Sequence, residues 1–87
     1  MSAREMFEKY RFNCIDLRKE FGKIDIRYYK ENKDNENQVL IEFYNERYVR
    51  ITTRYADMQF DLTKTYLEPG IIKAIYKQIE ELGWLDE

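Results

Sequence analysis

The sequence predicts an α+β domain in which N- and C-terminal helices pack on one face of a four- to five-stranded antiparallel meander sheet. Three observations lead to this prediction. Apolar and polar residues alternate with a period of two through four successive runs, which is typical of antiparallel strands. Short polar segments separate these runs, as in a meander. Both ends of the chain carry helix signals, and the 87 residues are enough for one domain, 1–87, with a single core.

The N-terminal helix is predicted over residues 3–10. Ser2 and Glu5 have the spacing of a capping box, in which each side chain accepts a hydrogen bond from the backbone N–H of the other residue. The apolar residues that follow share one helical face, which we expect to be buried: Ala3, Phe7 and Tyr10. The next segment, 12–21, fits either a strand or a continued helix. A strand is favoured, and Gly22 is its natural break.

Strands are predicted over residues 23–30, 38–44, 47–55 and 58–63, because apolar side chains recur at every second position in each run. Asn45 and Glu46 form a tight turn in which Asn45 is expected to tolerate a positive φ. One face of the sheet is then apolar and is expected to carry the two helices. Its residues are Ile24, Ile26, Val39, Ile41, Phe43, Val49, Ile51, Met58 and Phe60.

The C-terminal helix lies within residues 67–84, where a start signal, an apolar stripe and a stop signal all occur. Pro69 suits the first turn, where the missing N–H has no intrahelical partner to lose. Gly83 suits the left-handed residue after the last turn, and Trp84 can pack back on the helix behind it. The stripe that we expect to be buried consists of Ile72, Ile75, Ile79 and Leu82, with Ile71 and Tyr76 beside it.

The sequences of the two ends are also similar to those of other proteins. The sequence AREMFE at 3–8, together with AI at 74–75 and KQIEELGW at 77–84, is similar to the ends of small proteins carried by phages and prophages of low-GC Gram-positive bacteria. The middle of the chain, 12–63, shows no such match. The resemblance implies a phage or prophage setting, and it implies no catalytic residue.

Composition excludes several classes of function. The net charge is −2 and the pI is near 5.3, which argues against a protein that coats nucleic acid or an anionic membrane by charge alone. Cys14 is the single cysteine, so an internal disulfide and a cysteine-based zinc site are excluded. No signal peptide and no long apolar run is present. We therefore expect a protein in the cytoplasm of a bacterial host cell, without a membrane partner.

The sequence contains few of the residues that enzymes commonly use for catalysis. The chain has no histidine, which is the commonest general base and metal ligand, and Ser2 is its only serine. No glycine-rich phosphate loop occurs. We expect no enzymatic activity, no cofactor and no bound metal. The alternative is a carboxylate-based, metal-dependent enzyme that would use Asp25, Glu42 and Asp61, which strand alternation places on one face of the sheet.

The face of the sheet opposite the helices is the candidate functional surface. Strand alternation places tyrosine and arginine side chains there, and these two residue types dominate binding hot spots. The residues are Arg27, Tyr29, Leu40, Tyr44, Tyr48, Arg50 and Arg54, and all except Leu40 are candidate binding residues. A solvated face in which the arginines pair with nearby carboxylates remains open. The expected partner is a host or phage protein, or a second copy. A single-stranded nucleic acid is the alternative, disfavoured by the acidic net charge.

Overall fold

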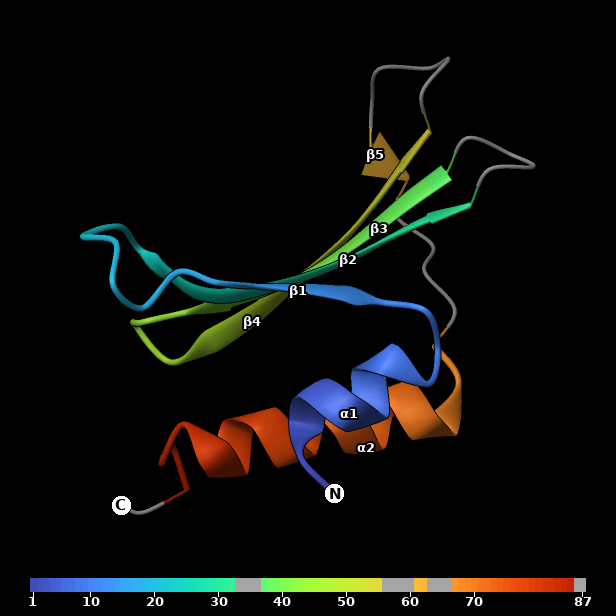
Figure 1. Cartoon of the computed structure of the whole chain (residues 1–87). Helices are drawn as coiled ribbons and strands as arrows, with labels where there is room; N and C mark the ends of the chain where they lie inside the picture. The colour runs from blue at the N-terminus through green and yellow to red at the C-terminus, as the bar shows by residue number, and fades with distance from the viewer. Residues whose placement is uncertain (33–36, 56–60, 63–66, 86–87) are drawn as a thin grey trace. The chain divides into compact units, whose positions relative to one another are not determined.

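The computed structural model describes residues 1–32, 37–55, 61–62 and 67–85, and it confirms the predicted α+β class. A short helix is followed by antiparallel strands and then by a longer helix (Figure 1). The residues form two compact units. One combines Met1–Phe12 with Tyr66–Glu87, and the other contains Asn13–Thr65. The packing of the helices on one face of the sheet stays a prediction. No helix in the described ranges is long and apolar enough to cross a membrane.

Helix α1 (Ala3–Glu8) begins as predicted. The Ser2 hydroxyl accepts from the Glu5 N–H at 3.2 Å and Glu5 Oε1 accepts from the Ser2 N–H at 3.0 Å, so the capping box is complete. These hydrogen bonds from Ser2 lower the pKa of the Glu5 carboxyl. The helix ends two residues before the predicted boundary. Arg11 adopts a left-handed φ of 66°, and the Phe12 N–H returns to the Phe7 carbonyl at 3.2 Å, which closes the helix end.

Helix α2 (Pro69–Glu81) also has the predicted ends. Pro69 occupies the first turn, Gly83 has a φ of 77°, and the Trp84 N–H donates to the Ile79 carbonyl at 3.2 Å. The predicted apolar side is correct only in part. Ile72 and Tyr76 are exposed, whereas Ile75, Ile79 and Leu82 are half-buried. The fully buried residues of the helix are Ile71, which was predicted, and Ala74 and Gln78, which were not.

Contact with α1 explains why the small Ala74 is buried. The Ala3 N–H donates to Glu81 Oε2 at 2.9 Å, and Ala3, Phe7 and Ala74 are completely buried. The two helices pack against each other, so small residues face inward where the backbones approach. A pattern of hydrophobicity does not report this requirement, because it weights the large Ile72 above the small Ala74.

Gly70 is one of these small residues, and its replacement gives a testable prediction. A Cβ atom added at Gly70 would overlap the Tyr10 hydroxyl and ring. We expect Gly70→Ala to lower the free energy of unfolding by about 1–2 kcal/mol, because the tyrosine ring must move and this outweighs the better helix propensity of alanine. In a Tyr10→Ala background the same substitution should be neutral or stabilising. Urea denaturation of the four proteins in this cycle measures both values, and equal effects in the two backgrounds would contradict the packing.

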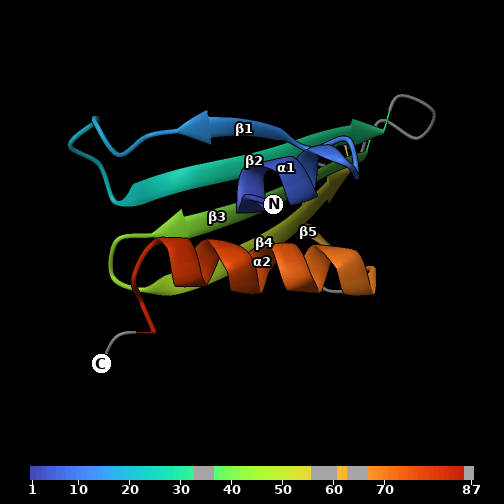
Figure 2. The ribbon, with the colours of Figure 1, turned by 60° about the horizontal axis from the view of Figure 1, so that its bottom comes forward.

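The sheet is the predicted meander, with the strands in sequence order. Strands β1 (Asn13–Asp16), β2 (Ile24–Asn32), β3 (Asn37–Tyr44) and β4 (Tyr48–Tyr55) are antiparallel neighbours, and Figure 2 shows them side by side in this order. A two-residue β5 (Asp61–Leu62) pairs with β4. The strand favoured for the ambiguous segment 12–21 is therefore present as β1. Met58, Phe60 and most of the predicted strand 58–63 lie outside the described residues.

The apolar face of the sheet is confirmed at its centre. Ile26 pairs with Phe43, Tyr28 pairs with Ile41, and all four side chains are buried. Tyr28 and Phe43 also meet edge to face, with ring centroids 6.0 Å apart and planes at 80°. These side chains form the core of this unit.

Two predictions for the apolar face are wrong. Ile51 follows the expected register opposite Ile41 but is exposed. Ile24 lies on the opposite face. A β-bulge separates it from Ile26: Ile24 pairs with Tyr44 and Ile26 with the adjacent Phe43, so β2 contains one extra residue.

The β3–β4 connection is a three-residue turn. The Arg47 N–H donates to the Tyr44 carbonyl at 3.0 Å, and the positive φ of 71° belongs to Arg47 and not, as predicted, to Asn45. Asn45 has a different role. Its backbone N–H donates to the Lys23 carbonyl at 2.8 Å and its Nδ2 to the Gly22 carbonyl at 2.9 Å. Asn45 thereby ties the turn to the start of β2.

Asp16 and Arg18 order the start of the β1–β2 connection, and their contact predicts a pH effect. Arg18 donates from Nε to Asp16 Oδ1 at 3.0 Å and from Nη2 to Oδ2 at 2.6 Å. These bonds lower the pKa of the Asp16 carboxyl from 3.8 to about 2. The pair therefore stabilises the fold above about pH 4, and this contribution disappears as the pH falls toward 2. Since both side chains are about half exposed, it is only a few tenths of a kcal/mol. An NMR titration of Asp16 should give this low pKa, and Arg18→Gln should return it toward 3.8; an unchanged pKa would contradict the pairing.

Candidate functional site

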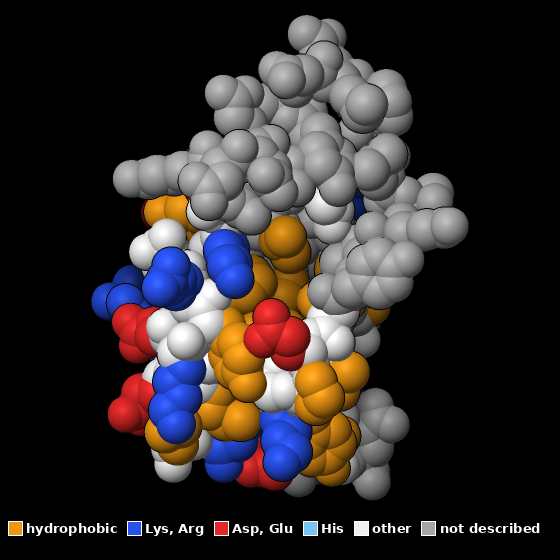
Figure 3. All heavy atoms as spheres, turned by 90° about the vertical axis from the view of Figure 1, so that its right-hand side faces the viewer, with side chains coloured by type: hydrophobic (Ala, Val, Ile, Leu, Met, Phe, Trp, Pro, Cys, Tyr) orange, Lys and Arg blue, Asp and Glu red, His pale blue; other side chains and the backbone are white. Residues whose placement is uncertain are grey.

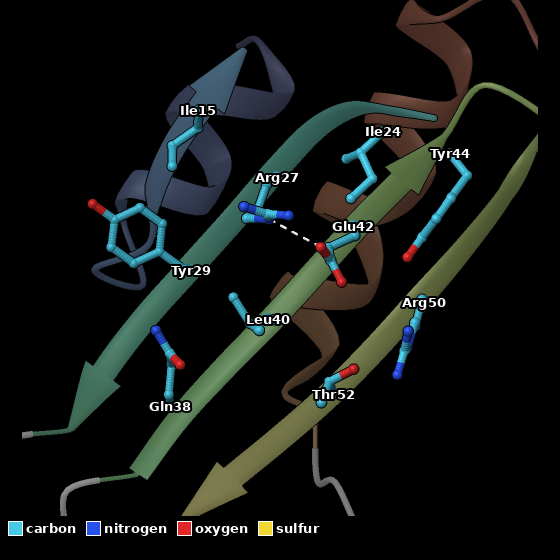
Figure 4. A pocket seen from close by; sticks show the side chains of 10 residues that line it. All are labelled: Ile15, Ile24, Arg27, Tyr29, Gln38, Leu40, Glu42, Tyr44, Arg50 and Thr52. Atoms are coloured by element: carbon cyan, nitrogen blue, oxygen red, sulfur yellow. Dashed lines mark hydrogen bonds and ion pairs between the residues drawn. The ribbon is translucent and has the colours of Figure 1, made fainter. Parts of the chain in front are cut away.

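A groove lies on the polar face of the sheet, across strands β1 to β4 (Figure 4). It has a volume of about 540 Å³, comparable to small-molecule and peptide sites. Side chains from four adjacent strands line it because the register places them on one face. They are Ile15, Ile24, Arg27, Tyr29, Gln38, Leu40, Glu42, Tyr44, Arg50 and Thr52.

An ion pair between Arg27 on β2 and Glu42 on β3 lies at the centre of the groove. Arg27 Nε donates to Glu42 Oε2 at 2.9 Å, as the dashed line in Figure 4 shows. The Glu42 side chain is only 9% exposed, whereas one third of the Arg27 side chain is exposed. Arg50 is the cross-strand neighbour of Glu42 on β4 and is exposed. A buried carboxylate is thus flanked by two arginines on adjacent strands, and both guanidinium groups can be reached from solvent.

Aromatic side chains lie at one end of the groove. Tyr44 and Tyr48 pair across the β3–β4 hairpin, and their rings stack with centroids 4.7 Å apart and planes at 16°. Tyr48 is 47% exposed and extends this aromatic surface beyond the groove itself. Ile24 faces Tyr44 across β2 and β3 because the bulge has turned it onto this face. The groove therefore has an apolar, aromatic end next to a charged centre.

The structure brings together most of the residues that the sequence predicts. Arg27, Tyr29, Tyr44 and Arg50 all line the groove, and Tyr48 stacks on one of them. Arg54 is in register opposite Gln38 on β3, but its side chain lies outside the described part of the structure. Five of the six candidates thus occupy one continuous surface.

Sequence reasoning missed four of the lining residues: Ile15, Ile24, Gln38 and Thr52. Gln38 and Thr52 follow from the same period-two alternation that identified Leu40 and Arg50, so counting along the strands could have found them. Ile15 depends on the pairing of β1, and Ile24 on the bulge. Neither of these features has a clear signal in the sequence.

The alternative hypothesis is a metal-dependent enzyme that uses carboxylates. The described structure does not bring these carboxylates together. Glu42 is engaged with Arg27, and the side chain of Asp61 lies outside the described residues. Within the parts of the chain that are described, no three Asp, Glu or Cys side chains form a group that could hold a metal ion.

Charge on the surface is mixed. On the side of the molecule drawn in Figure 3, Lys and Arg side chains are interspersed with Asp and Glu, and hydrophobic side chains lie between them. The described residues on this side form no patch of a single sign such as nucleic-acid-binding surfaces have. Comparisons of the chain with protein-family models, with curated proteins and with solved structures found no match, so the groove itself is the basis for a proposal of function.

Proposed function

We propose that this protein is a non-catalytic accessory protein of the phage or prophage type that binds a partner protein through the groove and the adjoining Tyr48. The observation that carries this proposal is the composition of the surface: two tyrosines stacked at its end and two arginines at its centre. Tyrosine and arginine are enriched among the residues that dominate protein–protein binding energy, because they combine a large contact area with a polar end.

The rigidity of the groove also favours a role in binding. Its side chains project from adjacent strands of a regular sheet, so the backbone holds them in fixed positions before a partner arrives. The Arg27–Glu42 pair fixes one guanidinium group in the same way. The phage or prophage setting rests on the terminal sequence motifs alone.

A protein is favoured over a nucleic acid as the partner. The whole chain has a net charge of −2, which disfavours a partner as strongly anionic as a phosphate backbone. The stacking of Tyr44 on Tyr48 covers one face of each ring, which leaves only the other face of each to an incoming base.

Photo-crosslinking tests the proposal with a matched control. Benzoylphenylalanine is introduced in place of Tyr48, or in place of Tyr76, which is similarly exposed at 57% but lies on α2. In the cells in which the protein is naturally made, we expect a discrete protein adduct from position 48 and none of that mass from position 76. The additional substitution Arg50→Ala should abolish the adduct.

Three results would contradict the proposal. The first is an identical adduct from both positions, and the second is an adduct that survives Arg50→Ala. The third is a product that nuclease digests and that forms less as the salt concentration rises, which would indicate a single-stranded nucleic acid. An adduct of twice the mass of the chain would identify the partner protein as a second copy.

A further inference from the structure

A second hollow lies beside the groove, at the end of the sheet where the β1–β2 connection meets the β3–β4 turn (Figure 1). We call it the apolar cup. It has a volume of about 400 Å³, which is large enough to admit one aromatic side chain, and most of its surface is apolar. Its lining residues are Leu17, Glu20, Gly22, Lys23, Ile24 and Tyr44, of which the last two also line the groove.

Phe21 lies in the same connection but not in the cup. Its side chain is completely exposed, although the residues on either side of it, Glu20 and Gly22, both line the hollow. A single exposed apolar side chain is common on protein surfaces and needs no explanation by itself. Phe21 differs because an apolar hollow that can hold a phenyl ring lies directly beside it on the chain. One copy therefore presents both a projecting ring and a place that can bury a ring.

The adjacency of these two features determines the kind of assembly that they can make. When a surface pairs with the same surface of a second copy, a two-fold axis relates the copies, and every contact occurs twice. A projection and a hollow on one short segment can satisfy each other in this way. The assembly then closes at two copies, because both rings are buried and both cups are filled. A projection far from its hollow would instead give an open chain of copies.

The residues around Phe21 favour one arrangement of the two segments. If the segments lie antiparallel, with the two-fold axis between Phe21 and Gly22, each Phe21 lies opposite Gly22 of the second copy and each Glu20 opposite its Lys23. A Cβ atom added at Gly22 would meet no atom beyond its chain neighbours within 4 Å, so the space in front of this glycine is open to an incoming ring. Glu20 and Lys23 are exposed and opposite in charge. The two-fold contact thus places apolar surface against apolar surface and acid against base.

We propose that this chain forms a weak, two-fold symmetric dimer in which Phe21 of each copy enters the apolar cup of the other and packs against Ile24 and Tyr44. Each phenylalanine buries about 150–250 Å² and covers a similar area of the cup, so the two contacts together bury at most about 1,000 Å², the lower limit for a specific interface. The dimer is therefore transient, and the fold of each copy does not depend on it. This inference goes beyond the proposed function, because the contact uses neither Tyr48 nor Arg50.

Sedimentation velocity of the purified protein over a range of concentrations measures the dimer. We expect a monomer at micromolar concentrations and an increasing dimer fraction toward about 1 mM, without larger species. Phe21→Ala should weaken dimerisation by at least about thirtyfold, since it removes the central side chain from both sides of the contact. Tyr76→Ala is the matched control, because it removes an exposed aromatic side chain from α2 and should leave dimerisation unchanged.

Two charge variants test the two-fold arrangement itself. Glu20→Lys places two positive side chains of each copy at the contact and Lys23→Glu two negative ones, so each variant alone should dimerise about fivefold more weakly. Mixed in equal amounts, the two variants should recover the dimer, because opposite charges then face each other.

Gly22→Val tests the cup while Phe21 stays intact. The added side chain has room in the single chain but occupies the space that the ring of the second copy needs, so dimerisation should be lost. The ¹H–¹⁵N NMR spectrum of each variant reports whether it remains folded.

Isotope-filtered NMR identifies the cup that the ring enters. In an equal mixture of labelled and unlabelled protein, we expect nuclear Overhauser effects from the Phe21 ring to Ile24 and Tyr44 between different molecules. The inference is overturned if the ring contacts only the cup of its own chain, if the protein remains monomeric at about 1 mM, or if Phe21→Ala leaves the dimer intact. It is also overturned if the charge variants do not recover the dimer on mixing. The proposed function is tested separately, in cells and through position 48, so either proposal can fail alone.

Discussion

Phe43→Ala is expected to lower the free energy of unfolding by about 3–5 kcal/mol, the largest effect that we predict for a single substitution. Phe43 is completely buried at the centre of β3, where Ile26 and Val49 are its cross-strand neighbours and the Tyr28 ring meets it edge to face. Truncation removes the ring and leaves a cavity among these side chains. Small domains are stable by only about 5–15 kcal/mol, so the loss is a large fraction of the total. Urea denaturation followed by circular dichroism measures it.

Phe21→Ala is the matched control for this substitution. Phe21 lies in the β1–β2 connection of the same compact unit and is fully exposed. The identical change should therefore alter the free energy of unfolding by no more than about 0.5 kcal/mol. If the two variants were equally stable, the buried face of the sheet would be assigned incorrectly.

The helix ends were predictable because their chemistry is local. The capping box needs only Ser2 and Glu5, three residues apart, and the stop at Gly83 needs only a residue that accepts a positive φ. Each signal involves groups within one turn of the helix. No knowledge of the tertiary structure is required to recognise them.

The buried side of α2 was predictable only in part, for the opposite reason. It depends on where α1 lies, and the clearest mark of that contact is the close approach of Tyr10 to Gly70. Glycine and alanine contribute almost nothing to a hydrophobic stripe. A sequence pattern therefore selects Ile72, which the structure leaves in solvent.

Much of the candidate site was predictable because period-two alternation holds without interruption from Ile26 to the end of β2 and through β3 and β4. Counting along these strands places Arg27, Tyr29, Tyr44 and Arg50 on one face. The bulge before Ile26 inverts the alternation for Ile24. One inserted residue leaves no trace in the composition, so the apolar end of the groove became visible only in the structure.

Glu42→Leu should have the second largest effect. It removes the carboxylate that accepts from Arg27 Nε at 2.9 Å and leaves that guanidinium group without this partner in a partly buried groove. Breaking a fully buried ion pair costs about 3–5 kcal/mol; because one third of the Arg27 side chain is exposed and can be hydrated, we expect about 1–3 kcal/mol here. Chemical denaturation of the single variant measures this loss.

The double variant Arg27→Leu/Glu42→Leu distinguishes the ion pair from simple packing. Removal of both charges leaves no unpaired group, so the double variant should be more stable than the sum of the two single effects predicts, by about 1–2 kcal/mol. The exposed pair Lys77 and Glu80 on α2, 3.0 Å apart, provides the control cycle, in which the coupling should not exceed about 0.5 kcal/mol. If the two cycles gave the same small coupling, Glu42 would not hold Arg27 in place.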